Sequence, residues 1–166
     1  MTAATAALTD TFREVMASVC TPVSVVTVMV DGRPHGTTVS AFASLSLRPP
    51  MVLVSLDAGS DLLAMVRETE RFGVNILGSD QSPLAMGFAR KGSTKFDGVP
   101  WTVRHGLPRI GRAPGWLACD VQTFVNGGDH VVLLGSVVDA EVADGMPLTY
   151  HARTFGTHTA ARHPEP

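Results

Sequence analysis

Small hydroxyl side chains are concentrated in one segment of the chain, GTTVSAFASLSLRPPMVLVSL at residues 36–56. If this segment is one extended strand, alternate side chains face the same way. One face then carries four hydroxyls and a single aromatic ring: Thr38, Ser40, Phe42, Ser44 and Ser46. That face has no charged residue. It suits either solvent, as in a half-buried antiparallel strand, or a flat ligand that needs hydrogen bonds.

A second candidate is the loop ARKGSTKF at residues 89–96, which combines Arg90, Lys91 and Lys95 with Ser93. Positive side chains on a glycine-containing loop can hold a phosphate through charge and backbone N–H groups. A solvated basic turn is the alternative for a loop of this composition. The loop is therefore a candidate anion site whose meaning depends on what lies beside it.

Two further positions have polar groups where a ligand contact is possible. Ser60 precedes a helical pattern, and helix N-termini favour anions. Asp61 follows it, and a carboxylate there would already occupy the positive end, so a simple helix cap is the alternative. His130 begins an apolar strand directly after a turn, where its ring can donate or accept a hydrogen bond or simply lie half-exposed at a strand end.

Several familiar motifs are absent from the sequence: GxGxxG, GxxxxGK[ST] and GxSxG do not occur. The six histidines form no i, i+4 pair, and Cys20 and Cys119 form no CxxC, so we expect no metal site and no disulfide. The net charge of −2, without a dominant basic cluster, argues against nucleic acid or an anionic membrane as the main partner.

Length and composition indicate one globular domain covering residues 1–166, because 45% of the residues are hydrophobic and 17% charged. We expect an ordered core over about residues 9–155 and flexible ends at 1–8 and 159–166. The start of the chain lacks the pattern of a signal peptide, and no segment is long and apolar enough to span a membrane. We therefore expect a cytoplasmic protein.

The elements that must position these side chains are mostly strands. Hydrophobic alternation and turn residues predict two strands around Asp31-Gly32, and further strands at 50–56, 71–77, 115–125, 130–142 and 147–155. The strand at 50–56 is expected to be buried on both faces, because it is continuously apolar. Residues 91–114 are expected to form a loop.

Helical spacing predicts three short helices, at 9–19, 60–69 and 82–90. The first is expected to begin with a capping box of Thr11 and Glu14 and to end before Pro22, and the others to be capped by Ser60 and Ser82. Because strands dominate and follow as hairpins, a closed antiparallel barrel with helices at its ends is favoured over a doubly wound parallel sheet.

Taken in order, six segments resemble the flavin reductase-like family, the small NAD(P)H:flavin oxidoreductases that serve two-component monooxygenases. After the segment 36–56 come SDLL, FGVNIL, LAMGFARKGSTKF, GDHVVLLGSV and PLTY, so the resemblance extends from Gly36 to Tyr150. It implies a mainly β fold, a split β-barrel with a few short flanking helices. It also implies a homodimer with flavin at the interface.

The resemblance implies site residues as well. Those expected to contact flavin are Thr37, Thr38, Val39, Ser40, Ala41, Ser44, Leu45, Ser46, Asp57, Ser60, Lys95 and Phe96. Those expected to contact the nicotinamide nucleotide are Gly128, Asp129, His130 and Tyr150. No dedicated catalytic acid or base is expected, because the protein's part in hydride transfer is to place the two reacting rings.

The implied activity is hydride transfer from NADH or NADPH to FMN or FAD, with the reduced flavin supplied to a separate monooxygenase. The sequence near Gly128 contains no arginine pair that could bind the 2′-phosphate of NADPH. This absence favours NADH as the hydride donor. Two alternatives stay open at this point. One is a split-barrel module that binds flavin or haem without turnover, and the other is a flavin oxidase of the pyridoxamine-phosphate-oxidase type.

Overall fold

The computed structural model describes residues 3–161. Within them lie the helices α1 (Ala3–Ala17), α2 (Asp61–Thr69) and α3 (Ser82–Ala89). The strands are β1 (Thr21–Pro22), β2 (Ser24–Val30), β3 (Arg33–Val39), β4 (Phe42–Leu47), β5 (Pro50–Asp57), β6 (Arg71–Ile76), β7 (Trp101–Arg104), β8 (Leu107–Ile110), β9 (Gly115–Gly127), β10 (His130–Val142), β11 (Leu148–His151) and β12 (Thr154–Thr157). The protein is mainly β, as predicted.

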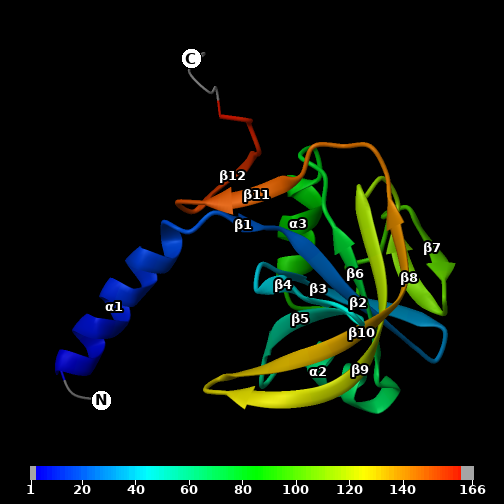
Figure 1. Ribbon diagram of the computed structural model, residues 1–166, viewed down its shortest axis with the longest axis horizontal. Helices are drawn as coiled ribbons and strands as arrows, with labels where there is room; N and C mark the ends of the chain where they lie inside the picture. The colour runs from blue at the N-terminus through cyan, green and yellow to red at the C-terminus, as the bar shows by residue number, and fades with distance from the viewer. Residues whose placement is uncertain (1–2, 162–166) are drawn as a thin grey trace.

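A seven-stranded antiparallel sheet in the order β3-β2-β6-β9-β10-β5-β4 forms the body of the molecule (Figure 1). Its end strands, β3 and β4, do not pair with each other in the described chain, so the barrel is open. The prediction of a closed barrel was therefore wrong, and the split barrel implied by the family resemblance is confirmed. The β2–β3 turn is the predicted one, and Asp31 and Gly32 both have positive φ, 49° and 73°.

The hydroxyl-rich segment is not one strand, which corrects the first expectation from the sequence. Strand β3 ends at Val39, and after Ser40 and Ala41 the chain enters β4, which pairs with β5 at the opposite end of the sheet. The alternation therefore does not continue from Thr38 to Ser44. Strand β5 is buried mainly on one face, at Val52, Val54 and Leu56, and not on both.

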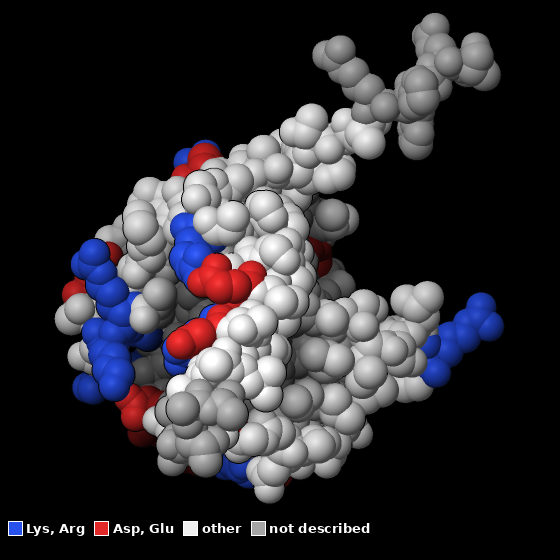
Figure 2. All heavy atoms as spheres, turned by 90° about the vertical axis from the view of Figure 1, so that its left-hand side faces the viewer, with Lys and Arg blue, Asp and Glu red and all other residues white. Residues whose placement is uncertain are grey.

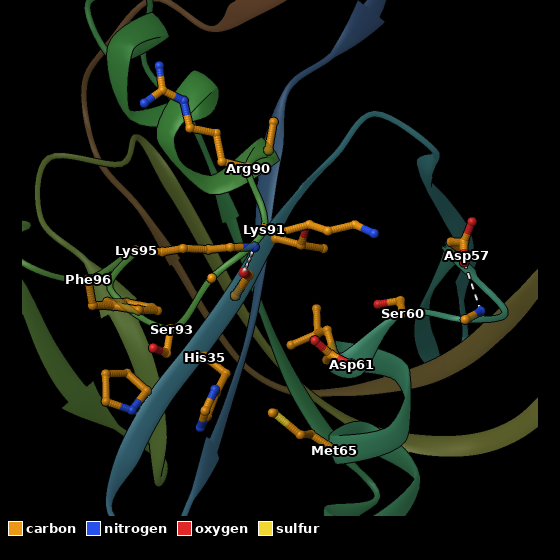
Figure 3. Close-up of a pocket in the computed structure, with 17 residues that line it drawn as sticks. His35, Asp57, Ser60, Asp61, Met65, Arg90, Lys91, Ser93, Lys95 and Phe96 are labelled. Atoms are coloured by element: carbon orange, nitrogen blue, oxygen red, sulfur yellow. Dashed lines mark hydrogen bonds between the residues drawn. The ribbon is translucent and has the colours of Figure 1, made fainter.

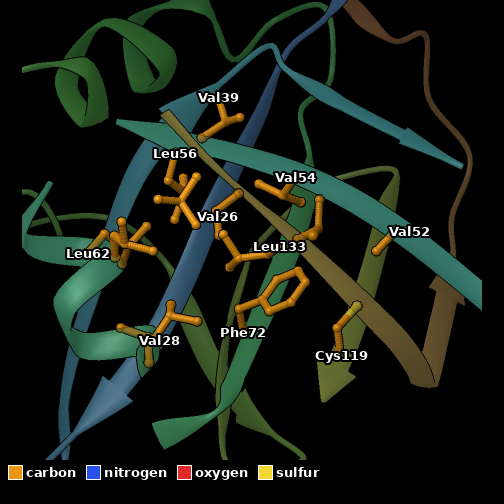
Figure 4. Packing of buried hydrophobic residues seen from close by; sticks show 14 residues of the cluster. Val26, Val28, Val39, Val52, Val54, Leu56, Leu62, Phe72, Cys119 and Leu133 are labelled. Carbon is orange, nitrogen blue, oxygen red and sulfur yellow. The ribbon is translucent and has the colours of Figure 1, made fainter. Parts of the chain in front are cut away.

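The main core lies inside the curved sheet, beneath α2 (Figure 4). Strands β2, β5, β6 and β10 each contribute buried side chains, among them Val26, Val54, Phe72 and Leu133. Helix α2 adds Leu62, Leu63 and Val66, the buried residues of the helix. This packing fixes the start of α2 against the end of β5.

A second cluster lies under α3, where Phe88 and Phe96 meet edge to face at 4.8 Å between ring centroids. Between strands, the buried amide of Asn75 donates to the Pro108 carbonyl at 3.4 Å and accepts from the Ile110 N–H at 2.7 Å. This amide joins β6 to β8. Helix α3 begins after Gln81, whose side chain does not cap it, so the predicted cap at Ser82 was wrong.

Residues 91–114 contain a hairpin that the sequence analysis predicted as loop. Strands β7 and β8 pair from Trp101–Ile110 to Arg104–Leu107. Arg104 holds the hairpin to β10 by donating to Asp139 at 2.6 Å and 3.1 Å and to Glu141 at 2.6 Å. These pairings join residues far apart in the chain, so local composition does not reveal them.

Helix α1 extends away from the sheet at one side of the molecule (Figure 1). It begins at Ala3, before the predicted start at residue 9, and Thr11 donates to the Ala7 carbonyl inside the helix, so the predicted capping box was wrong. The helix ends at Ala17, before Pro22. Of the ends that were expected to be flexible, residues 1–2 and 162–166 lie outside the described part of the chain.

Contacts at its carboxyl end hold α1 to the small sheet β1-β11-β12. The Ala152 N–H donates to the Ala17 carbonyl at 2.8 Å, and Arg153 donates to Glu14 at 2.6 Å. Among residues 3–161, no helix has both the length and the apolar character needed to cross a membrane.

Candidate flavin and nucleotide site

A cavity of about 570 Å³ lies between β3, the start of α2 and the loop after α3 (Figure 3). Three stretches of chain line it: 34–37, residues of 57–65, and residues of 89–96. Lysine side chains lie on the side of the loop, and Ser60 and Asp61 point in from α2 (Figure 3). The cavity therefore brings together two of the segments singled out in the sequence, the basic loop and the start of the helix.

The start of α2 is shaped by short hydrogen bonds. Ser60 is the N-cap, as predicted, and its hydroxyl accepts from the Leu63 N–H at 3.4 Å. The Asp57 carboxylate accepts from the Gly59 N–H at 2.7 Å, which closes the turn between β5 and the helix. Asp61, the first helical residue, directs its carboxylate into the cavity (Figure 3).

Lys95 is the most firmly held cation of the cavity. Its ammonium donates to the Gly36 carbonyl at 3.1 Å and to the Phe88 carbonyl at 3.0 Å. Burial lowers the pKa of Lys95, and the charge of Asp61 acts in the opposite direction. An ammonium has three N–H donors, so one remains for a bound group.

Phe96 and Thr37 line the same cavity but also have structural contacts. Phe96 is largely buried, with its ring 5.7 Å from that of Trp101. The Thr37 hydroxyl donates to the Phe88 carbonyl at 3.4 Å. With Asp57, Ser60 and Lys95, they are the five predicted flavin contacts that the structure gathers at the cavity.

The other predicted flavin contacts lie outside the lining of this cavity. Thr38 donates to the Ala85 carbonyl at 2.7 Å, which docks α3 on β3, and Val39 is buried in the core. Exposed positions account for most of the rest, namely Ser40, Ala41, Ser44 and Leu45, while Ser46 is half-buried and its hydroxyl accepts from the Arg48 N–H at 3.2 Å. Strand β4 is irregular here, with a register shift between Ser44 and Ser46.

The turn at Gly128 and Asp129 lies beside the cavity without lining it. The Ala58 N–H donates to the Asp129 carbonyl at 2.9 Å, and His130 pairs with Asp57 across the strands. The His130 ring lies 2.8 Å from the Asp129 carboxylate, and this contact lowers the pKa of Asp129. The turn and the cavity thus share the loop that follows β5.

Tyr150 is placed apart from the other predicted nucleotide contacts. It lies on β11, opposite Thr21 of β1, and its ring centroid is 5.1 Å from that of Phe155. Within one chain it contributes nothing to the cavity lining.

Several cavity residues were not among the predicted contacts, namely His35, Asp61, Met65 and Lys91. Two of them follow simple periodicities that could have indicated them. His35 is two residues from Thr37 on the same strand, and Met65 is four residues from Asp61 on the same helix. In the described chain, no group of three or more His, Cys, Asp or Glu residues is placed to hold a metal ion.

Comparison with known proteins identifies the class to which this fold and cavity belong. Residues 16–159 match the model of the family described as flavin reductase like domain. The chain belongs to this family.

Its relatives include the reductase component of a 4-nitrophenol 4-monooxygenase/4-nitrocatechol 2-monooxygenase from Rhodococcus opacus. That protein is 40% identical over 145 residues, 87% of this chain and 78% of the relative. An FMN reductase (NADH) from Agrobacterium fabrum is 36% identical over 149 residues, 87% of this chain and 83% of the relative.

A solved structure of an NADH:FAD oxidoreductase from Streptomyces globisporus, in complex with NAD and FAD fragments, is similar in fold. It superposes with a TM-score of 0.87 at 29% identity, over 91% of this chain and 93% of the other.

Proposed function

We propose that the protein is an NADH-dependent flavin reductase, which transfers a hydride from NADH to FMN or FAD. The observation that carries this proposal is the family match over residues 16–159, together with relatives named as NADH-dependent reductases. The split barrel and the cavity are in accord with it. The pyridoxamine-phosphate-oxidase type and the non-catalytic binding module have no comparable support.

We infer that the phosphate end of the flavin lies in the cavity. Lys95 keeps one donor available there, and Lys91 reaches across the cavity (Figure 3). Cationic donors with a hydroxyl at a helix start are suited to phosphate oxygens. The exposed link Ser40-Ala41 and strand β4 would then hold the ring system through small side chains and backbone groups.

When bound, flavin supplies the ring that accepts the hydride, and the residues of this chain only position it. The Gly128–Asp129 turn and His130 border the loop after β5, so we propose that they orient the nicotinamide nucleotide. Their position beside the cavity supports this role.

We further propose that the active form is a homodimer in which α1 packs on a second copy of the chain. Its apolar side chains Leu8, Phe12, Val15 and Met16 share one face at helical spacing and are exposed, as is Val19 just beyond the end of the helix. On the side of the molecule toward which α1 extends, uncharged atoms cover much of the surface, with Asp and Glu near the middle and a group of Lys and Arg along one edge (Figure 2). Contiguous exposed apolar faces are typical of protein interfaces.

The proposed physiological role is to supply reduced flavin to a separate monooxygenase. The Rhodococcus opacus relative is named as the reductase component of a monooxygenase, which supports this role. We propose a single domain over residues 1–166, acting in the cytoplasm. The sequence length and the shared core of the large sheet support one domain.

The function is tested by mixing the purified protein with NADH and either FMN or FAD and following the NADH absorbance. Flavin-dependent oxidation above the buffer rate is expected, with NADPH oxidised more slowly. An unchanged rate with both flavins would support the binding module instead.

The dimer is tested by light scattering on Phe12→Glu, with Arg13→Glu, which lies outside the apolar face, as control. The first is expected to be monomeric, and the second to keep the mass of the wild type. A monomeric wild type would contradict the proposal.

A further inference from the structure

The walls of the cavity carry opposite charges. Lys91 and Lys95 lie on the side of the loop that follows α3, whereas Asp61 points in from α2 (Figure 3). Arg90 belongs to the same lining but its guanidinium points away from the centre (Figure 3). An anion that enters therefore meets two cations and one carboxylate.

Asp61 is not neutralised by a direct bond to the neighbouring lysine. The Lys95 ammonium uses two donors on the carbonyls of Gly36 and Phe88, and Asp61 affects it through its field. The Asp61 side chain is exposed within the open cavity, so its carboxylate can both repel an anion and accept hydrogen bonds from a ligand. A carboxylate accepts and does not donate.

FMN and FAD differ in the group that they would place beside this carboxylate. FMN ends in a phosphomonoester, which carries a charge of about −1.5 to −2 at pH 7. FAD continues into a diphosphate, with one charge on each phosphate, and then into a ribose with two hydroxyl donors. A carboxylate is therefore unfavourable to the end of FMN and favourable to the ribose hydroxyls of FAD.

We propose that Asp61 is a specificity-determining residue that favours FAD over FMN. The inference rests on the proposed placement of the phosphate end of the flavin in the cavity. Lys91 and Lys95 attract either nucleotide, and Asp61 separates the two by charge and by hydrogen bonding.

The test is the steady-state kcat/KM of the full-length protein for riboflavin, FMN and FAD, with NADH as donor. Asp61→Asn keeps the size of the side chain, and the N-cap at Ser60 is unchanged. The variant is expected to raise the FMN-to-FAD ratio of kcat/KM about fivefold, which is the scale of one exposed charge interaction. The kcat/KM for riboflavin, which has no phosphate, should stay unchanged. The change should shrink as salt is added, which a purely structural effect would not do.

Two control variants separate failure of this inference from failure of the placement. Glu68→Gln removes an exposed carboxylate of α2 that does not line the cavity, and it should leave the ratio unchanged. Lys91→Gln should lower kcat/KM for FMN and FAD but not for riboflavin. Suppose that Lys91→Gln has this effect, but Asp61→Asn leaves the FMN-to-FAD ratio unchanged because it alters kcat/KM for neither nucleotide or for both equally. The specificity role of Asp61 is then overturned, and the placement of the phosphate end stands. If Lys91→Gln acts equally on all three flavins, the placement itself is overturned.

Discussion

The ammonium of Lys95 and the carbonyl of Gly36 are joined by a hydrogen bond of 3.1 Å, which ties the loop after α3 to strand β3. A second bond from the same ammonium, to Phe88, ties the loop to the end of α3. One side chain therefore fixes the relative position of two walls of the cavity. The basic loop, which the sequence left open as a solvated turn, is anchored at this residue.

Lys95→Met is expected to lower the free energy of unfolding by about 1–3 kcal/mol, because two carbonyls lose a charged donor. It should also weaken FMN binding, since the donor left for the phosphate is removed. Denaturant unfolding and fluorescence titration measure the two effects. Lys91→Met is the control for stability, and an equal loss of stability in both variants would contradict the anchoring role.

His130→Ala is expected to raise the KM for NADH more than the KM for flavin, because His130 pairs with Asp57 of the cavity wall and belongs to the proposed nicotinamide site. Steady-state kinetics with each substrate varied in turn measures this. His158→Ala, which alters an exposed histidine near the carboxyl end, should change neither value. An unchanged KM for NADH in His130→Ala would remove the residue from the nucleotide site.

Asn75→Ala is expected to lower the free energy of unfolding by about 2–3 kcal/mol, because the buried Ile110 N–H loses its acceptor. Urea unfolding followed by far-UV circular dichroism measures this. Asn126→Ala, at an exposed position of β9, should cost far less. A small effect at Asn75 would mean that the β6–β8 contact is held by packing alone.

Gly135→Ala is expected to destabilise the protein by about 1–3 kcal/mol through overpacking. A Cβ there would lie 2.6 Å from the ring of Phe72 and 3.2 Å from the Cβ of Cys119. Adding Phe72→Leu should restore part of the loss, which thermal unfolding of the double variant will show. At Gly127 the nearest atom to an added Cβ is 3.8 Å away, so Gly127→Ala is a mild control.

The two cysteines are expected to differ sharply in reactivity, since Cys119 is buried and Cys20 exposed. Burial raises the pKa of Cys119 to about 12. The folded state therefore keeps this proton more tightly than the unfolded state, and the associated stability, complete below about pH 8.5, is lost as pH rises toward 12. Iodoacetamide at pH 8 should label Cys20 alone in the native protein, which mass spectrometry measures. Equal labelling of the two cysteines would contradict this.

Local patterns predicted the elements whose contacts are themselves local. The Asp31-Gly32 turn and the Ser60-capped helix need only neighbouring residues, and both were predicted correctly. Helix α1 begins at Ala3 and not at residue 9, because the alanine-rich stretch before Thr11 favours helix strongly. The break after Val39 was not predicted, because apolar and hydroxyl residues continue to alternate in the sequence beyond it. In the structure, the chain crosses there to the other end of the sheet.

The site was predictable in part for the same reason. Ser60 and Lys95 were named because each lies in a distinctive motif. That Asp61 and His35 line the same cavity becomes clear only when α2 and β3 are brought together, because no spacing in the sequence records the distance between that helix and that strand. The hairpin β7–β8 likewise depends on Arg104 meeting Asp139, a pairing across thirty-five positions of the chain.

The assembly of the cavity from three separate stretches, 34–37, 57–65 and 89–96, couples occupancy to folding. No single stretch contains enough of the walls to bind a nucleotide, so an unfolded chain offers no comparable site. Any ligand of the cavity must then raise the free energy of unfolding by mass action. Once the ligand concentration exceeds the dissociation constant, this increase grows with the logarithm of their ratio. In a cell, the supply of flavin would therefore add to the stability of the folded protein.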